Sequence, residues 1–125
     1  MIGGVGPHRE VLLVEDSPGD VRLMREAFHQ VNLSVHLNIA LDGVEAMAFL
    51  RRQGEFRGAP RPDFILLDLN LPRMDGREVL AHIKADAELK TIPTVILTTS
   101  MADADIAKSY ELNANCYLCK PVHLD

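Results

Sequence analysis

Residues 64–76 read FILLDLNLPRMDG, and the first part of this stretch decides the fold. Residues 64–67 form a short, continuous apolar run, which suits a strand covered on both faces in a parallel sheet. Residues 11–14 (VLLV) and 94–97 (TVIL) are runs of the same kind. Residues 34–40 instead alternate polar and apolar side chains, which predicts an edge strand with one wet face. Residues 116–119 (CYLC) complete a set of five predicted strands.

Helical segments lie between the predicted strands, and each begins at a residue that can cap a helix. The four caps are Ser17, Asp42, Asp75 and Ser100, each with an acid three residues later. The capping oxygen accepts a backbone N–H that the helix leaves unpaired, and the acid favours the positive end of the helix. Strands and helices therefore alternate along the chain, which predicts an α/β fold with a doubly wound parallel sheet of five strands.

Composition limits the class of protein. The chain has 125 residues, 47% apolar and 25% charged, which is the balance of one soluble domain. Its net charge of −5 argues against nucleic acid as a partner. No apolar run reaches the ~18 residues of a membrane span and no secretion signal is present, so we expect a cytoplasmic protein. We expect residues 1–9 to form a loose tail and residues 10–125 to form the domain.

The two cysteines, Cys116 and Cys119, have the C-x-x-C spacing of a redox pair. Redox pairs of this kind normally open a helix after a strand, whereas these cysteines lie within a predicted strand. Residues three apart on a strand point to opposite faces, so a disulfide between them would be strained. We therefore expect a structural role for both cysteines, in keeping with a reducing cytoplasm.

Polar residues follow the predicted strands at their carboxyl ends, where sheets of this type bind ligands. They are Glu15 and Asp16 after the first strand, Asp68 after the third, Thr98 after the fourth, and Lys120 followed by Pro121 after the fifth. Each alone is explained as a helix cap or a turn residue. Together they predict a crevice in which carboxylates repel each other by about 4 kcal/mol per closest pair. Protonation of one carboxylate would relieve the repulsion, but a hard divalent cation is the simpler answer, and oxygen-only ligands favour Mg²⁺ over zinc.

The motifs around these residues resemble the receiver domain of bacterial two-component response regulators. They are VEDS at 14–17, DLNLPRMDG at 68–76, LTTS at 97–100 and YLCKP at 117–121. The resemblance covers residues from about 10 to 125 and implies the flavodoxin-like receiver fold, with strand order 2-1-3-4-5. The connection 51–62, the LTTS variant and the sequence ANCY at 114–117 look most like single-domain regulators paired with bacterial phytochrome histidine kinases.

The resemblance implies the chemistry of the strand-end residues. Asp68 is the nucleophile that takes a phosphoryl group from phosphohistidine on a sensor histidine kinase and becomes an acyl phosphate. Glu15, Asp16, Asp68 and the backbone carbonyl of Asn70 hold Mg²⁺, with Mn²⁺ as an alternative. Asn70 also tunes hydrolysis of the acyl phosphate. The resemblance thus implies that the chain catalyses its own phosphorylation and slow dephosphorylation and is not a turnover enzyme.

The resemblance also implies how phosphorylation is read out. Lys120 and Thr98 contact phosphoryl oxygens, a cis peptide bond between Lys120 and Pro121 directs the lysine, and Ser100 tunes hydrolysis. In this family, Thr98 would move inward on phosphorylation and Tyr117 would rotate into the space that it leaves. This change alters the surface of the fourth helix and fifth strand, which contacts a downstream protein target and can form a homodimer. The alternative is that Tyr117 is an ordinary half-buried tyrosine with no part in switching. Only residues 122–125 follow, so the family's fifth helix is expected to be missing.

Other functions remain alternatives on the sequence alone. A receiver-like interaction domain that no longer uses phosphate is disfavoured, because the acidic set, Thr98 and Lys120 are all present. A phosphohydrolase with a nucleophilic aspartate typically needs a second acid two residues later, where this chain has Asn70. A flavodoxin-type cofactor binder would need a Gly-rich phosphate loop after the first strand, and none follows it.

Overall fold

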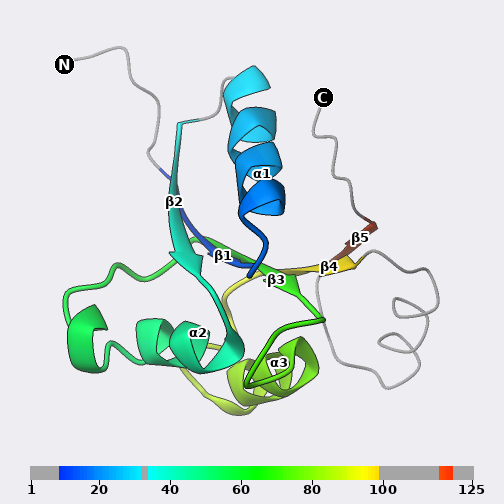
Figure 1. The fold of residues 1–125 in the computed structure, drawn as a ribbon. Coiled ribbons are helices and arrows are strands. Elements are labelled where there is room, and N and C mark those ends of the chain that lie inside the picture. Colours follow the sequence, from blue (N-terminus) through cyan, green and yellow to red (C-terminus); the bar gives the residue numbers. More distant parts are fainter. Residues whose placement is uncertain (1–8, 32–33, 99–115, 120–125) are drawn as a thin grey trace, which may run out of the picture.

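A computed structural model describes residues 9–31, 34–98 and 116–119. Its five strands are β1 (Arg9–Val14), β2 (Val35–Ala40), β3 (Phe64–Asp68), β4 (Thr94–Thr98) and β5 (Cys116–Cys119). They form one sheet in the order β2-β1-β3-β4-β5, and every neighbouring pair is parallel. The predicted α/β fold, its parallel sheet and the edge position of β2 are confirmed (Figure 1).

The helices in the described part of the chain are α1 (Pro18–Gln30), α2 (Gly43–Leu50) and α3 (Gly76–Ala85). Figure 1 shows α1 on one face of the sheet and α2 and α3 on the other. The predicted caps begin all three helices: Ser17 Oγ accepts from Asp20 N–H, Asp42 from Glu45 N–H, and Asp75 from Arg77 N–H. The fourth predicted helix, from Ser100, lies outside the described residues, as does the segment after β5 where the fifth helix was expected to be missing.

Alternating strand residues supply two separate cores. Leu12 and Val14 of β1 pack with α2 and α3, in a cluster that includes Ile65, Leu67 and Ile83. Val11 and Leu13 face the opposite way and pack with Met24 and Phe28 of α1, together with Leu66 and Leu97. Both faces of β1 and β3 are covered, which accounts for the apolar runs 11–14 and 64–67 and places the carboxyl ends of both strands in the middle of the sheet.

Two local features differ from the sequence prediction. β1 begins at Arg9, the last residue of the expected tail, because the Arg9 N–H donates to the Ser34 carbonyl at 3.0 Å. The connection between α2 and β3 contains a short 3₁₀ helix, η1 (Gly54–Phe56), whose Phe56 ring meets Phe49 edge-on at 5.6 Å between ring centroids. None of the helices described here has the length and apolar character to cross a bilayer.

Candidate functional site

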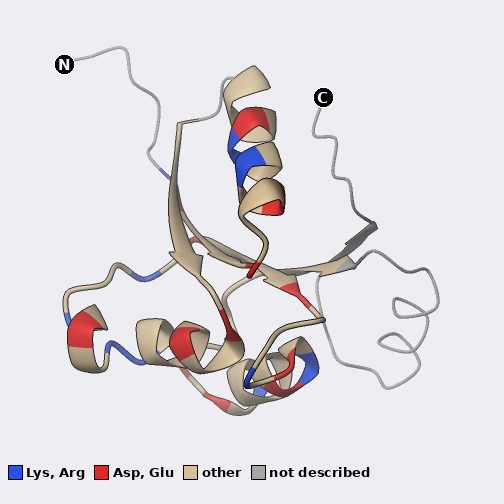
Figure 2. Ribbon diagram, viewed as in Figure 1, with Lys and Arg blue, Asp and Glu red and all other residues tan. Residues whose placement is uncertain are grey.

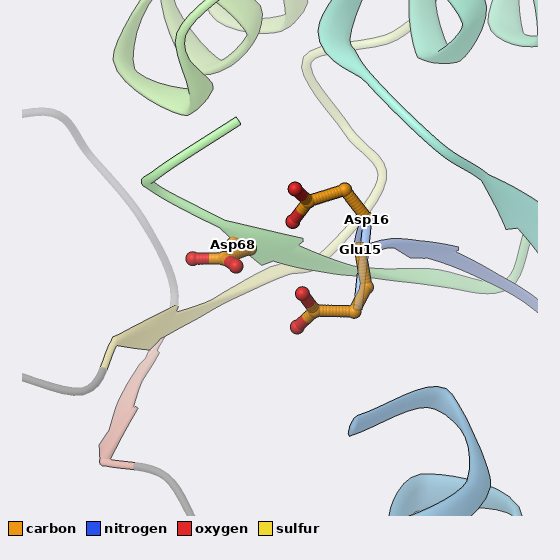
Figure 3. A group of neighbouring side chains, drawn as sticks. All are labelled: Glu15, Asp16 and Asp68. Carbon is orange, nitrogen blue, oxygen red and sulfur yellow. The ribbon is translucent and has the colours of Figure 1, made fainter. Parts of the chain in front are cut away.

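Three carboxylates meet where β1 and β3 end. Glu15 and Asp16 directly follow β1, and Asp68 is the last residue of β3. Val14 of β1 pairs with Leu67 of β3, so the residues that follow them, Glu15 and Asp68, lie side by side on neighbouring strands. One oxygen from each of the three side chains lies within 4.8 Å of the other two. Figure 3 shows the three groups turned toward a common space, and the ends of both strands are red in Figure 2.

The three carboxylates differ in their exposure. Glu15 and Asp68 are 1% and 5% exposed, whereas Asp16 is open to solvent. Asp68 Oδ1 accepts the Asn70 N–H at 3.0 Å, and Glu15 Oε2 accepts the Ser17 N–H at 3.3 Å. The Glu15 N–H donates to the Ala40 carbonyl at 2.9 Å, which ties this residue to the end of β2. Two of the three acids are therefore buried and held by backbone donors.

The electrostatics of this cluster favour a cation. Unit charges at the observed 4.8 Å limit repel by about 3.5 kcal/mol per pair at an effective dielectric constant of 20. Solvent screens the pairs that involve Asp16, but the buried pair of Glu15 and Asp68 is screened much less. Carboxylate oxygens without nitrogen or sulfur ligands suit Mg²⁺ or Mn²⁺. The residues present therefore fit a hard divalent cation.

Backbone contacts hold the loop that follows Asp68. The Leu69 N–H donates to the Leu97 carbonyl at 3.3 Å, and the Gly76 N–H donates to the Leu69 carbonyl at 3.0 Å. A Cβ atom on Gly76 would lie 2.2 Å from the Asp68 carbonyl oxygen, so only glycine permits this approach of α3 to the end of β3. Asn70, whose carbonyl was a predicted ligand, lies exposed at the start of this loop.

Two further predicted site residues lie in β4 and β5, on the side of β3 away from β1. Thr98 ends β4, one residue beyond Leu97, which pairs with Asp68. Tyr117 lies in β5 and pairs with Ile96. Ser100, Lys120 and Pro121 are outside the described residues.

Sequence reasoning missed one contact of the loop that follows Asp68. Asp42, predicted only as a helix cap, also accepts from Arg73 in the loop between β3 and α3. Burial raises the pKa of Asp42, but the Glu45 N–H and the Arg73 guanidinium together hold it below its ordinary value. The two residues are 31 positions apart, and no local pattern joins them.

Known proteins resemble this chain in sequence and in fold. Response regulator Rcp1 of Synechocystis sp. (strain PCC 6803) is 53% identical over 118 residues, which are 94% of this chain and 80% of Rcp1. A crystal structure of Mn²⁺-bound Rcp1 matches with a TM-score of 0.83, covering 93% of this chain and 84% of that one.

Two further solved structures are similar. The phosphorylated cyanobacterial phytochrome response regulator RcpA is 51% identical, with a TM-score of 0.84, covering 93% of this chain and 83% of that one. The bacteriophytochrome response regulator AtBRR is 40% identical, with a TM-score of 0.88, covering 94% and 86%. The family model of the response regulator receiver domain matches residues 11–125. Sequence motifs, sheet order, the acidic cluster and these matches agree, and the chain belongs to the response regulator receiver domain family.

Proposed function

We propose that Asp68 is the phosphoryl acceptor of this receiver domain and that Glu15, Asp16, Asp68 and the Asn70 carbonyl hold Mg²⁺. The observation that carries this proposal is the meeting of three carboxylates at the ends of β1 and β3, with Asp68 buried among them. Mn²⁺ has the same oxygen preference, and Rcp1, a close relative, has been crystallised with Mn²⁺ bound. A divalent cation bound there would neutralise negative charge on the transferred phosphoryl group.

The chain's own residues then position the reaction. The Asn70 N–H, bound to Asp68 Oδ1 at 3.0 Å, fixes the orientation of the nucleophilic carboxylate. An Asp68 oxygen attacks phosphorus while the bond from phosphorus to the histidine nitrogen of the kinase breaks, which leaves an acyl phosphate on Asp68 and histidine on the kinase. We assign Lys120 and Thr98 to the phosphoryl oxygens, Asn70 and Ser100 to the rate of hydrolysis, and a cis peptide to Lys120–Pro121.

Output follows from the added charge. Phosphorylation adds about −1.5 to −2 charges and three acceptor oxygens at the strand ends. We propose that Thr98 moves toward them and that Tyr117, in the adjacent strand β5, changes rotamer in response. The surface formed by the fourth helix and β5 would then engage a downstream protein or a second copy of the chain.

Receiver domains take their phosphoryl group from histidine kinases, and we propose a phytochrome-type kinase here. The support is that RcpA and AtBRR, at 51% and 40% identity, are phytochrome response regulators. The cytoplasm is the compartment in which such a kinase would meet this chain. Phosphotransfer from a purified bacterial phytochrome kinase tests the pairing, and transfer no faster than from an unrelated histidine kinase would contradict it.

Acetyl phosphate tests the assignment of Asp68. The protein is incubated with acetyl phosphate and Mg²⁺, and intact mass spectrometry counts the phosphoryl groups. We expect one group on the wild type, none on Asp68→Asn, and none after the cation is removed with EDTA. Asp63→Asn is the matched control, since Asp63 is an exposed aspartate just before the other end of β3. Equal labelling of wild type and Asp68→Asn would refute the assignment.

A further inference from the structure

An ion pair ties the start of α2 to the loop that carries Asn70. Arg73 Nε and Nη2 both donate to Asp42 Oδ2, at 2.8 Å and 2.7 Å. The other Asp42 oxygen accepts the Glu45 N–H at 2.8 Å, so one carboxylate both caps α2 and binds the arginine. The Asp42 side chain is 12% exposed and the Arg73 side chain is 60% exposed, so water is kept from most of the carboxylate but reaches the arginine.

Arg73 holds an unusual backbone conformation. Its φ is +64°, and the Met74 N–H donates to the Pro72 carbonyl at 2.7 Å. These two features define a γ-turn centred on Arg73 with φ in the left-handed region, a rare and strained turn for a residue with a side chain. Strained backbone of this kind persists where surrounding contacts fix it, and it is concentrated at functional sites. The bonds to Asp42 hold the side chain of this residue.

A second contact lies beside the ion pair. A Cβ atom on Gly43 would lie 2.2 Å from the Met74 carbonyl oxygen and 2.6 Å from Met74 Cβ. The turn between β2 and α2 therefore touches the loop between β3 and α3 through backbone atoms. Asn70 lies between Asp68, fixed in the sheet, and this contact region, so the path of the loop from 69 to 75 is determined at both ends.

From this arrangement we infer that Asp42 and Arg73 are positioning residues of the phosphoryl-acceptor site: they hold the 69–75 loop in the path that presents the Asn70 carbonyl beside the three carboxylates. The inference rests on the proposed function, because it gives the loop a part in cation binding. A cation ligand must be held to within about 0.5 Å of its working position. Loss of the ion pair releases the strained turn, and the loop then samples paths that move Asn70.

The competing interpretation is that the pair only stabilises the fold. The two interpretations differ in what they predict for cation affinity at a temperature where every variant is folded. Arg73→Ala removes both bonds to Asp42, and Asp42→Asn removes the charge while keeping an oxygen that can cap α2. Arg73→Lys keeps the charge but not the paired donors. The matched control is Arg52→Ala, because Arg52 is an exposed arginine with a φ of +55° at the end of α2.

Mn²⁺ affinity is measured by titration calorimetry, and amide hydrogen exchange of the 69–75 loop is measured in the cation-free protein. We expect Arg73→Ala and Asp42→Asn to weaken Mn²⁺ binding by about 10-fold, the lower end of what supporting residues around a metal contribute. The double variant should be no weaker than either single one, Arg73→Lys should fall between, and Arg52→Ala should match the wild type. Exchange at the Met74 amide should be faster in Arg73→Ala without any cation.

Each outcome decides the matter. Wild-type Mn²⁺ affinity in Arg73→Ala and Asp42→Asn, with only a lower unfolding temperature, would show that the pair is purely structural. If Arg73→Ala is unfolded at the assay temperature, Asp42→Asn and Arg73→Lys give the answer. A wild-type protein that binds no Mn²⁺ would instead overturn the proposed function itself, so the two failures are distinguishable.

Discussion

Gly76→Ala is the substitution for which the structure gives the clearest prediction. Gly76 begins α3, and an added Cβ would lie 2.2 Å from the Asp68 carbonyl oxygen and 2.7 Å from Leu69 Cα. Both neighbours are backbone atoms, of the proposed acceptor Asp68 and of Leu69, so no rotamer change relieves the clash. Ordinary contact for a Cβ begins at 3.4 Å. Either the end of β3 or the start of α3 must therefore move by about 1.2 Å.

This displacement has two measurable costs. Overpacking at a tightly packed position destabilises a fold by about 1–3 kcal/mol, and backbone neighbours place this site at the upper end. Misplacement of a reacting group by ~1 Å lowers a rate by about 100-fold. Because the atoms that move belong to Asp68, we expect the rate of phosphorylation to fall by that order even in the fraction of protein that is folded.

The assay compares Gly76→Ala with Gly58→Ala. Gly58 has nothing within 4 Å of its virtual Cβ, so alanine there should change stability by less than about 0.5 kcal/mol. Urea unfolding gives the stability, and the initial rate of labelling by acetyl phosphate at saturating Mg²⁺ gives the reactivity. A Gly76→Ala protein with the stability and labelling rate of the wild type would refute the reasoning, since the backbone contact would then not constrain Asp68.

Two other predictions concern Asp42 and the cysteines. Because folding lowers the pKa of Asp42 from 3.8, its ionised form stabilises the fold above that value, and this stabilisation is lost as the pH falls through the folded pKa. Urea unfolding at a series of acidic pH values should therefore show a shallower loss of stability in Asp42→Asn, and an identical loss in both proteins would contradict this. Cys116 and Cys119 lie in one strand at ~3.3 Å per residue, about 10 Å apart and beyond the roughly 7 Å reach of a disulfide. Thiol titration of the unreduced, denatured protein should find both thiols free. If neither thiol is found, the placement of both cysteines in one strand is wrong.

Much of the fold could be predicted because its determinants are local. The apolar runs of β1 and β3 are covered on both faces, and alternation in β2 reflects its place at the edge. Ser17 and Asp42 could be identified as caps because the bonds they accept come from three residues ahead. At Asp75 the same reasoning found the helix start but not the donor, which is Arg77. The Asp75 side chain accepts the N–H two residues ahead, which is an Asx-turn, and this bond takes the place of the usual capping bond from three residues ahead.

The candidate site likewise has one part that could be predicted from the sequence and one part that could not. Glu15, Asp16 and Asp68 could be placed together because the carboxyl ends of neighbouring parallel strands meet at one edge of a sheet. The pairing of Asp42 with Arg73 could not be found, because it joins two loops that no repeat or register relates. The motif PRMDG also does not reveal that Arg73 has a positive φ, because residues other than glycine rarely adopt that conformation.

The two kinds of determinant therefore specify different things. Hydrophobic pattern and register specify that acidic side chains converge, and they would do so in any sequence with these strands and these acids. Backbone contacts at Gly43 and Gly76 and the Asp42–Arg73 pair specify how closely the loop after Asp68 follows the sheet. A chain with the acidic cluster but with bulkier residues at those two glycines would keep the sheet and its charge, yet Asp68 and Asn70 would lose the positions that their proposed roles in binding a cation and a phosphoryl group require. The strands thus bring the acids together at this edge of the sheet despite their mutual repulsion, and the glycine contacts set the path of the loop beside them.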